Sequence, residues 1–197
     1  MEFIKTNLED SYIIKPSKFG DDRGYFCPEY IEEDLSKLGF QGIKQVSESK
    51  SHKGVVRGLH YQFDPYSQAK IVRVTRGGVI DVIADLREGS PTFGRAIGVL
   101  LTEENNEQLF VPRGFAHGFV SLEDNTKFEY YVDNKYMPSM EGGILWNDKN
   151  LNIPWDKWFN EFGIIKPDLS NKDIDRQTLN DYIKEKDKTK KFVYRRK

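Results

Sequence analysis

Cysteine is almost absent from this sequence, which has one cysteine and three histidines among 197 residues. The single Cys27 excludes an internal disulfide and any zinc or redox motif built on paired cysteines, and this fits a reducing compartment. A lone cysteine between Phe26 and Pro28 is more often a small core residue than a nucleophile. We therefore expect Cys27 to pack in the core and to take no part in catalysis.

Long apolar runs and an excess of one charge are also lacking. No run approaches the roughly 20 residues of a membrane span, and residues 1–10 lack the charged start and apolar middle of a signal peptide. The sequence has 30 lysines and arginines and 31 aspartates and glutamates, for a net charge of -1. It therefore lacks the excess of positive charge that attracts nucleic acid or an anionic membrane. We expect a cytoplasmic protein with neither partner, and its length suits one domain.

The middle of the chain has a β pattern. Short segments rich in β-branched and aromatic residues are separated by Gly, Pro or Asn at intervals of about 8 to 12 residues, which is typical of a sandwich or barrel. Segments 70–76 and 79–86 flank the Gly77-Gly78 turn, and we predict a hairpin there, with Asp81 and Asp85 on its polar face. The opposite, apolar face would carry Val72, Val74, Ile80, Val82 and Ala84.

Segment 127–133 alternates in the same way. Phe128, Tyr130 and Val132 fall on one side of the predicted strand, and charged residues fall on the other. We therefore expect the Tyr130 side chain to point toward the interior.

Helices are predicted at only two places, both peripheral. Residues 31–38, closed by Gly39, and residues 178–186 have the pattern of short helices. Segment 184–197 is dense in lysine and arginine, and we expect it to form a solvated basic tail after a single domain over residues 1–183.

Two of the three histidines lie in segments punctuated by glycine and proline, which position the backbone tightly beside a strand. Residues 56–62 contain His60, and residues 111–119 contain the pattern P-x-G-x-x-H ending at His117, which resembles the second motif of the cupin barrels. Metal-binding cupins have a His-x-His pair in the first motif, but no second histidine follows His60. Because two imidazoles alone make a poor metal site, we expect no metal. The alternative interpretation is that both histidines are barrel residues without chemistry.

Five motifs occur in one order: FGDDRGYF at 19–26, VRGLHYQ at 56–62, SPTFG at 90–94, PRGFAHGF at 112–119 and WND at 146–148. Together they resemble the dTDP-4-dehydrorhamnose 3,5-epimerase family, over residues 3–173. The resemblance implies a mainly β, cupin-type jelly-roll barrel with a few short peripheral helices. It also implies cofactor-free epimerisation at C3 and C5 of a nucleotide-linked 4-keto-6-deoxyhexose, and a homodimer formed partly by strand exchange.

Epimerisation next to a ketone needs a base, a group that offsets the charge of the enolate oxygen, and an acid. Inversion requires that the proton leave one face of the ring and return to the other, so base and acid must be different side chains on opposite walls. His60 suits the base, because an imidazole can accept and return a proton, and Tyr130 suits the acid. Both match the family's catalytic positions. Lys70 matches the family lysine that faces the ketone oxygen, and Asp173 matches the carboxylate that pairs with the histidine.

By the same resemblance, a further set of residues contacts the nucleotide, the phosphates or the sugar: Arg23, Gln45, Ser47, Arg57, His117, Tyr136, Glu141 and Lys172. Arginine suits a diphosphate because its guanidinium offers paired donors at a fixed geometry. Two positions depart from the family pattern, since Pro28 replaces a glutamate and Ser47 replaces an asparagine. Glu29 follows one step later, but a one-residue slip on a strand turns a side chain to the other face unless a bulge re-aims it.

The leading hypothesis is conversion of dTDP-4-dehydro-6-deoxy-D-glucose to dTDP-4-dehydro-L-rhamnose, which supplies a deoxysugar for a cell-envelope polysaccharide. The two departures leave open a single-carbon epimerase, at C3 or C5, or a ketoisomerase on a related nucleotide sugar. Two other classes are a non-catalytic cupin that binds a sugar or nucleotide, and a metal-dependent cupin dioxygenase. The missing His-x-His pair argues against the dioxygenase.

We expect turnover to survive exhaustive chelation, because the residues implied by the resemblance act as side-chain acid and base in place of a Lewis acid. The measurement is the turnover of protein dialysed against EDTA, with elemental analysis of the same sample. Loss of turnover that an added metal restores would contradict the prediction.

Overall fold

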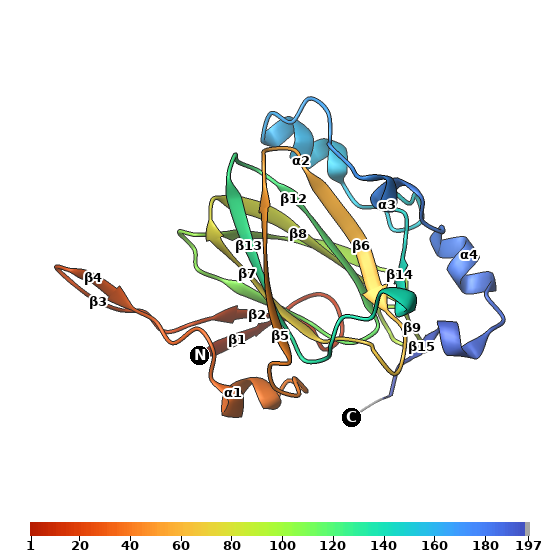
Figure 1. The fold of residues 1–197 in the computed structure, drawn as a ribbon, viewed down its shortest axis with the longest axis horizontal. Coiled ribbons are helices and arrows are strands. Elements are labelled where there is room, and N and C mark those ends of the chain that lie inside the picture. The colour runs from red at the N-terminus through yellow and green to blue at the C-terminus, as the bar shows by residue number, and fades with distance from the viewer. Residues whose placement is uncertain (196–197) are drawn as a thin grey trace.

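Two antiparallel sheets face each other in a β-sandwich (Figure 1). The computed structural model describes residues 1–195. The six-stranded sheet contains, in spatial order, β1 (Glu2–Lys5), β2 (Tyr12–Lys15), β11 (Gln108–Val111), β7 (Lys70–Arg76), β13 (Thr126–Val132) and β5 (Gln45–Ser51). The five-stranded sheet contains β10 (Ala96–Thr102), β8 (Gly78–Asp85), β12 (Phe115–Ser121), β6 (Val56–Gln62) and β14 (Glu141–Gly143). The predicted mainly β jelly roll is confirmed.

Apolar side chains from both sheets meet between them. Val72 and Val74 of β7 and Phe128 of β13 pack against Ile83 of β8 and Phe119 of β12, and all five are almost fully buried. Phe128 and Tyr130 lie on the inner face of β13, as the alternation predicts. His117 and Tyr130, two polar residues of the interior, pack against the Phe128 ring of this cluster.

The predicted hairpin at Gly77 is wrong. β7 pairs with β11 and β13, whereas β8 pairs with β10 and β12, so the chain changes sheets between them. Gly77 has a φ of +73°, and a Cβ atom there would lie 2.6 Å from Thr126 Oγ1, so this corner requires glycine. Because β8 is covered on both faces, Asp81 and Asp85 are completely buried and do not form a solvated face.

The helices are short and peripheral, as predicted, but their bounds differ. The first predicted helix is only α1 (Glu32–Ser36), and Gly39, with a φ of +95°, closes the turn after it. The second is α4 (Leu179–Lys184), and the Thr178 side chain caps its first turn. Two helices were not predicted, α2 (Trp155–Glu161) and α3 (Asn171–Ile174), and two single 3-10 turns span Pro138–Met140 and Lys188–Lys190. No helix within residues 1–195 is long and apolar enough to cross a membrane.

The helices cover the outer faces of the two sheets. Trp158 of α2 packs directly over Gly98 of β10, where a Cβ atom would lie 2.4 Å from the indole ring. Leu35 of α1 packs with Ile71 and Phe110 on the outer face of the six-stranded sheet. Each sheet is therefore buried on both sides over much of its area.

A two-stranded arm, β3 (Phe19–Asp21) and β4 (Gly24–Phe26), projects away from the sandwich (Figure 1). Its aromatic side chains are exposed: Phe19 by 62%, Tyr25 by 60% and Phe26 by 68%. Cys27, which follows the arm, is half-buried and lies 3.4 Å from Asn106 Nδ2, so its predicted place in the core is wrong. The chain leaves the sheet here, so no apolar layer closes over the thiol.

Residues 186–190 of the predicted solvated tail are exposed, but the tail packs on the fold at Lys191 and Phe192, which are buried. β15 (Phe192–Val193) pairs in parallel with β9 (Arg87–Glu88), and Phe192 is 5% exposed. The Phe192 ring packs against Tyr61 and Phe63, at centroid distances of 5.4 and 6.0 Å. The prediction relied on the many charged residues of this segment, but burial of the single Phe192 ring is enough to hold the chain against the sheet. Residues 196–197 of the predicted tail lie outside the described part of the chain.

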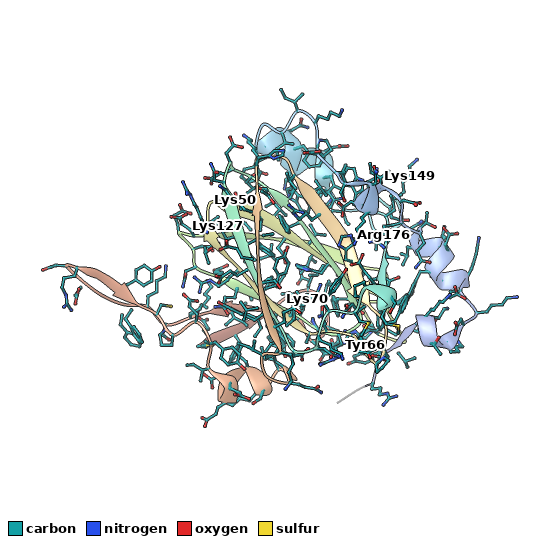
Figure 2. All side chains as sticks on the ribbon, in the orientation of Figure 1. Lys50, Tyr66, Lys70, Lys127, Lys149 and Arg176 are labelled. Atoms are coloured by element: carbon teal, nitrogen blue, oxygen red, sulfur yellow. The ribbon has the colours of Figure 1, made fainter. Side chains whose placement is uncertain are left out.

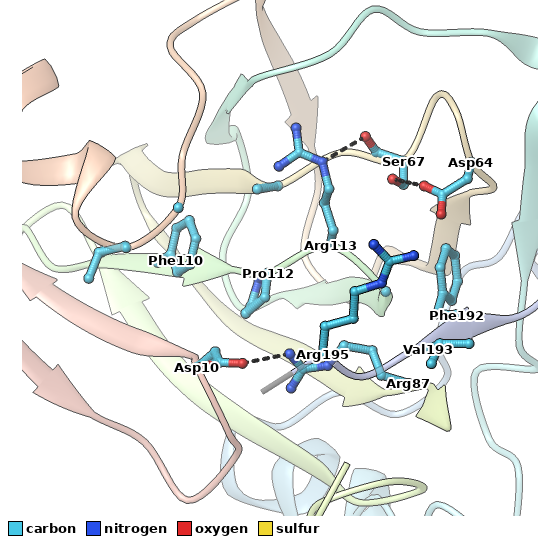
Figure 3. Close-up of a pocket in the computed structure, with 14 residues that line it drawn as sticks. Asp10, Asp64, Ser67, Arg87, Phe110, Pro112, Arg113, Phe192, Val193 and Arg195 are labelled. Atoms are coloured by element: carbon cyan, nitrogen blue, oxygen red, sulfur yellow. Dashed lines mark hydrogen bonds and ion pairs between the residues drawn. The ribbon is translucent and has the colours of Figure 1, made fainter. Parts of the chain in front are cut away.

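Next to β15 the surface is hollowed by about 280 Å³ (Figure 3). Arg87, Arg113 and Arg195 contribute to its lining, together with Asp10 and Asp64. The Arg87 guanidinium bonds to Asp10 Oδ2 at 2.7 Å, so part of this positive charge is already neutralised. None of the predicted site residues lines this hollow.

We expect Phe192→Ala to lower the free energy of unfolding by about 3 kcal/mol, because it removes a buried ring and leaves a cavity. Val193→Ala is the matched control, since Val193 is 63% exposed and its truncation should cost less than about 0.5 kcal/mol. Urea denaturation at one fixed protein concentration measures both. Equal effects of the two substitutions would show that the C-terminal strand does not anchor the fold.

Candidate active site

The two motif histidines are direct neighbours in the five-stranded sheet. His60 on β6 pairs with His117 on β12. The two backbones approach so closely that a Cβ atom on Gly118 would lie 2.4 Å from the carbonyl oxygen of Arg57. A Cβ atom on Gly58 would lie 2.5 Å from the Cα atom of Gly118. Glycine is therefore required in both motifs, and the close approach sets the spacing of the two imidazoles.

His60 is held by the carboxylate of Asp173. His60 Nε2 lies 3.1 Å from Asp173 Oδ1, and the Asp173 side chain is 5% exposed. Asp173 lies in the first turn of α3, where the Ser170 hydroxyl donates to its Oδ2 at 2.6 Å. The Gly58 amide donates to its Oδ1 at 2.9 Å. The same carboxylate thus caps α3 and fixes the imidazole on the wall formed by β6.

The Asp173 carboxylate is ionised at neutral pH. Burial by itself raises the pKa of this carboxyl group, but hydrogen bonds from His60, Ser170 and the Gly58 amide outweigh it and hold the pKa well below its usual range. An ionised carboxylate beside Nε2 favours the tautomer that carries its proton there. The other ring nitrogen, Nδ1, is then the basic atom, and the pair can accept a proton from a carbon acid.

Lys70 is the first residue of β7, in the opposite sheet, and its side chain lies inside the sandwich (Figure 2). Burial lowers the pKa of its ammonium group to about 8, against the opposing effect of the acidic groups Asp81 and Glu141. Its Nζ lies 3.4 Å from His117 Nδ1. A desolvated ammonium group is well suited to offset negative charge that develops on an oxygen atom.

Tyr130 points inward from β13, in the same sheet as Lys70 and across from His60. Its ring stacks edge-on against Phe128 and His117, at 4.8 and 6.2 Å between centroids. Its hydroxyl lies 3.4 Å from Ser49 Oγ on β5. Burial raises the pKa of the Tyr130 phenol well above its usual range, so the group is protonated at neutral pH and can serve as an acid.

His117 is enclosed by protein on both ring nitrogens. Its side chain is 3% exposed, Nε2 lies 2.8 Å from Asp81 Oδ1, and Nδ1 faces Lys70. Burial lowers the pKa of His117 and raises the pKa of Asp81. Sequence reasoning missed Asp81, because its strand alternates like one with a solvated face. The same alternation could have indicated Asp81, had β8 been recognised as a central strand that is covered on both faces. An acidic residue in such a strand must point into the interior of the protein.

Three predicted binding residues lie near Tyr130. Ser47 on β5 pairs directly with Tyr130, and Gln45 Nε2 donates to Ser47 Oγ at 2.8 Å. Arg57 on β6 is exposed, with its Nε 3.3 Å from Ser51 Oγ. Arg57 and Asp173 both line a hollow of about 260 Å³ at the surface. The structure therefore gathers these residues beside the catalytic candidates.

Three more predicted binding residues, Tyr136, Glu141 and Lys172, lie together beside β14, where Gly143, two residues after Glu141, pairs with His60. The Tyr136 hydroxyl donates to Glu141 Oε2 at 2.7 Å, and Lys172 Nζ lies 3.8 Å from Oε1. Arg176, which sequence reasoning missed, donates to Oε1 at 2.6 Å and is labelled beside β14 in Figure 2. Burial raises the pKa of Glu141, but the hydrogen bonds from Tyr136 and Arg176 outweigh it and hold the pKa below its usual value.

Arg23 is the one predicted site residue that the structure does not bring to the others. It lies at the turn of the projecting arm, where it forms an ion pair with Asp21 at 2.6 Å. Glu29 does not replace the family glutamate, because its carboxylate is committed to Arg73 at 2.9 Å and to Gln108 at 2.7 Å. Both partners lie on strands of the sandwich, so Glu29 is fixed away from the arm.

The remaining histidine, His52, forms an exposed pair with Asp168 at 3.1 Å, and both residues line the same hollow as Arg57 and Asp173. Within residues 1–195, no group of three or more His, Cys, Asp or Glu side chains is arranged to hold a metal ion. The groups that the described residues bring together are acids, bases and fixed charges.

Comparison with known proteins decides the family. The family model described as dTDP-4-dehydrorhamnose 3,5-epimerase matches residues 5–181. This chain belongs to the dTDP-4-dehydrorhamnose 3,5-epimerase family. It is 44% identical to the Shigella flexneri epimerase of that name, over 92% of this chain and 97% of the relative. The family comprises isomerases, so the prediction of an enzyme of this class is confirmed.

Solved structures of 3,5-epimerases and of a related monoepimerase resemble this one. The dTDP-6-deoxy-D-glucose-3,5-epimerase of Legionella pneumophila, in complex with dTDP-4-keto-L-rhamnose, is 36% identical with a TM-score of 0.87 and 99% of each chain covered. ChmJ, a 3′-monoepimerase from Streptomyces bikiniensis in complex with dTDP-quinovose, is 31% identical with a TM-score of 0.81, over 91% of this chain and 88% of its own. The epimerase fold therefore serves both double and single inversion.

We expect kcat/KM to fall as the pH rises through about 8, because Lys70 loses its proton there and no longer offsets enolate charge. Well below that pH Lys70 is fully protonated, so any change of kcat/KM with pH on the acidic side should come from other groups. Lys70→Arg keeps the charge at every accessible pH, and its alkaline limb should move above pH 9 although the maximal rate falls. A pH profile of kcat/KM for both proteins checks this, and an unchanged limb in Lys70→Arg would assign the limb to another group.

Proposed function

We propose that this chain inverts C3 and C5 of dTDP-4-dehydro-6-deoxy-D-glucose and releases dTDP-4-dehydro-L-rhamnose. The observation that carries the proposal is that the His60–Asp173 pair and Tyr130 come from opposite sheets. A base on one wall and a phenol on the other meet the geometric requirement of inversion, which a single side chain cannot meet. The reaction needs neither a redox cofactor nor a metal.

Each inversion begins with removal of the proton beside the ketone. His60 takes this proton at Nδ1, while Asp173 holds the protonated ring through Nε2. The electron pair moves into an enolate, and the Lys70 ammonium group offsets the charge on its oxygen. Tyr130 then delivers a proton to the carbon from the opposite face, and the configuration is inverted.

The nucleotide and phosphates are held around the catalytic groups. Arg57 and Lys172 supply positive charge for the diphosphate. Tyr136, which is 44% exposed, offers an aromatic surface for the base, and its hydroxyl is fixed by Glu141. Gln45, Ser47 and Glu141 supply polar contacts to the rest of the substrate.

A single-carbon epimerase remains the second candidate function, and one observation favours it. Pro28 replaces the family carboxylate just after the arm, and Glu29 is bound elsewhere, so a substrate site that received the arm of a second copy would differ in charge. The 31% identical 3′-monoepimerase has the same fold. NMR of the product from dTDP-4-dehydro-6-deoxy-D-glucose separates the candidates, since inversion at C5 as well as C3 is required for the L-rhamno sugar.

We propose further that the active species is a homodimer in the cytoplasm. The arm is exposed, and the β3–β4 turn that carries Arg23 projects away from β6, the strand of His60 (Figure 1). A second copy could receive this arm, burying its aromatic side chains and bringing Arg23 to the phosphates of the neighbouring site. A dTDP-linked substrate and the free Cys27 both fit a reducing interior.

We expect His60→Asn and Tyr130→Phe to fail at different steps. Without the base, neither proton exchange nor inversion should occur, with a loss of about 10²-fold to 10⁴-fold in kcat. With Tyr130→Phe the enolate should still form, but His60 can return the proton only to the face that it came from. In D₂O this variant should place deuterium at C3 or C5 of recovered substrate while making little inverted product.

Mass spectrometry and NMR of the recovered sugar distinguish these outcomes. Tyr131→Phe is the matched control, because Tyr131 lies next in β13 on the outer face and hydrogen-bonds Glu129, so its inversion rate should be near that of the wild type. Normal inversion by Tyr130→Phe would remove Tyr130 from the acid role. Deuterium exchange by His60→Asn would remove His60 from the role of base.

The dimer is testable by mixing two inactive variants. Arg23→Ala lacks the arm residue and His60→Asn lacks the base, so a mixed dimer contains one complete site if the arms are exchanged. After subunit exchange at equal concentrations, about a quarter of the wild-type sites should be restored. Sedimentation at the assay concentration should show a dimer, and a fully active monomer or the absence of complementation would refute exchange of the arms.

A further inference from the structure

A line of three ionisable side chains crosses the interior from one sheet to the other. Asp81 on β8 lies 2.8 Å from His117 Nε2, and His117 Nδ1 lies 3.4 Å from Lys70 Nζ on β7. Asp81 is completely buried and His117 is 3% exposed. The line thus begins at a carboxylate with no access to solvent and ends at the ammonium group assigned to the enolate oxygen.

The hydrogen-bonding capacity of the three groups determines which ring nitrogen of His117 carries the proton. An ammonium group has only donors, so Lys70 can bond to His117 Nδ1 only if that nitrogen carries a lone pair. The ring proton must then lie on Nε2, where the Asp81 carboxylate accepts it. If the proton moved to Nδ1, two donors would face each other and both hydrogen bonds would be lost.

We propose that Asp81 is a positioning residue for the reaction, which acts through His117 to orient the Lys70 ammonium group toward the enolate oxygen and to keep it charged. The inference rests on the proposed function. It changes the expected role of His117 from a substrate contact to the residue that connects Asp81 to Lys70, and we call these three residues the relay. Asp81 itself touches neither substrate nor any reacting atom.

The surroundings of Lys70 support a need for this charge. The groups that face it are His117 on β12, Asp81 on β8 and Glu141 on β14, with His60 and Tyr130 on the strands beside them. Burial lowers the pKa of Lys70, and Asp81 is the larger of the two acidic influences that oppose this. Glu141 is already hydrogen-bonded to Tyr136 and Arg176, so Asp81 is the carboxylate committed to the Lys70 side.

A purely structural role accounts less well for Asp81. Its Oδ2 is buried and has no hydrogen-bond partner among residues 1–195, so the carboxylate is costly where it lies. Asp85, four residues later on the same strand, shows what a structural carboxylate looks like here. Its oxygens accept hydrogen bonds from Arg87, Ser90 and Thr92.

The first test is Asp81→Asn, which keeps the size of the side chain and removes its charge. We expect kcat to fall about 10-fold to 10²-fold, less than for loss of a group that contacts the oxyanion directly. The alkaline limb of kcat/KM should move about one pH unit lower, because Lys70 loses an opposing charge. Asp34→Asn is the matched control, since Asp34 on α1 forms a surface pair with Lys37, and it should change neither quantity.

The second test is the double variant with His117→Asn, assayed at a pH below the limb of every protein compared. If Asp81 acts through His117, kcat of Asp81→Asn/His117→Asn should lie within about threefold of kcat for His117→Asn alone. If the kcat of the double variant is instead reduced by the product of the two single-variant factors, the two residues act independently and the proposal is overturned. A Tm decrease without a shifted limb would leave Asp81 a structural residue and would also overturn the proposal.

The third test needs neither activity nor a folded variant. In ¹⁵N-histidine NMR spectra of the ligand-free protein, the His117 resonance should report a neutral ring with its proton on Nε2 throughout the range from pH 6 to 8. The proton on Nδ1, or a charged ring at pH 7, would overturn the inference even if the enzyme is a 3,5-epimerase. Conversely, a wild-type protein that does not invert the dTDP sugar would refute the proposed function, while the NMR result would still decide how Asp81, His117 and Lys70 are arranged.

Discussion

Ionisable side chains between two sheets cannot be left without partners, because a charge removed from water costs more than packing returns. The interior of this protein is organised around that constraint. Asp173 is held by a helix turn, a backbone amide and His60, and Glu141 is held by Tyr136 and Arg176. Each of these carboxylates fixes the direction of another group. Neutralising these charges therefore also orients His60, Tyr136 and Arg176.

The close approach of β6 and β12 determines where those groups can lie. Gly58 and Gly118 let the two backbones pack without side chains between them, and the histidines of the two strands then lie opposite each other. The surroundings of the two imidazoles nevertheless differ. His60 is bound to a carboxylate near the surface and keeps some exposure, whereas His117 is bound to one inside and keeps almost none.

The candidate residues could be selected from the sequence, because the motifs that contain them can be recognised without knowing which strands are neighbours in the sheets. Alternation placed Tyr130 correctly, since β13 has one inner face. The same rule failed for Asp81, because a strand covered on both sides has no solvated face to which a carboxylate can be assigned. The corner at Gly77 was read as a hairpin, since a glycine pair signals a turn but not which sheet follows it. Phe192 was missed because one buried ring in a charged segment leaves no periodic signal.

The contact between Tyr130 and Ser49 bears on what happens after an inversion is complete. A phenol that has given its proton to carbon is left as a phenolate, while the imidazole across the cavity is left protonated, so the two walls end the step with opposite charges. Before a second carbon can be inverted, both must return to their starting forms. Ser49 lies on β5, the edge strand of its sheet, and its hydroxyl lies 3.4 Å from the Tyr130 phenol. In the proposed reaction this hydroxyl is placed to return a proton to the phenolate, and a double inversion would require that return twice.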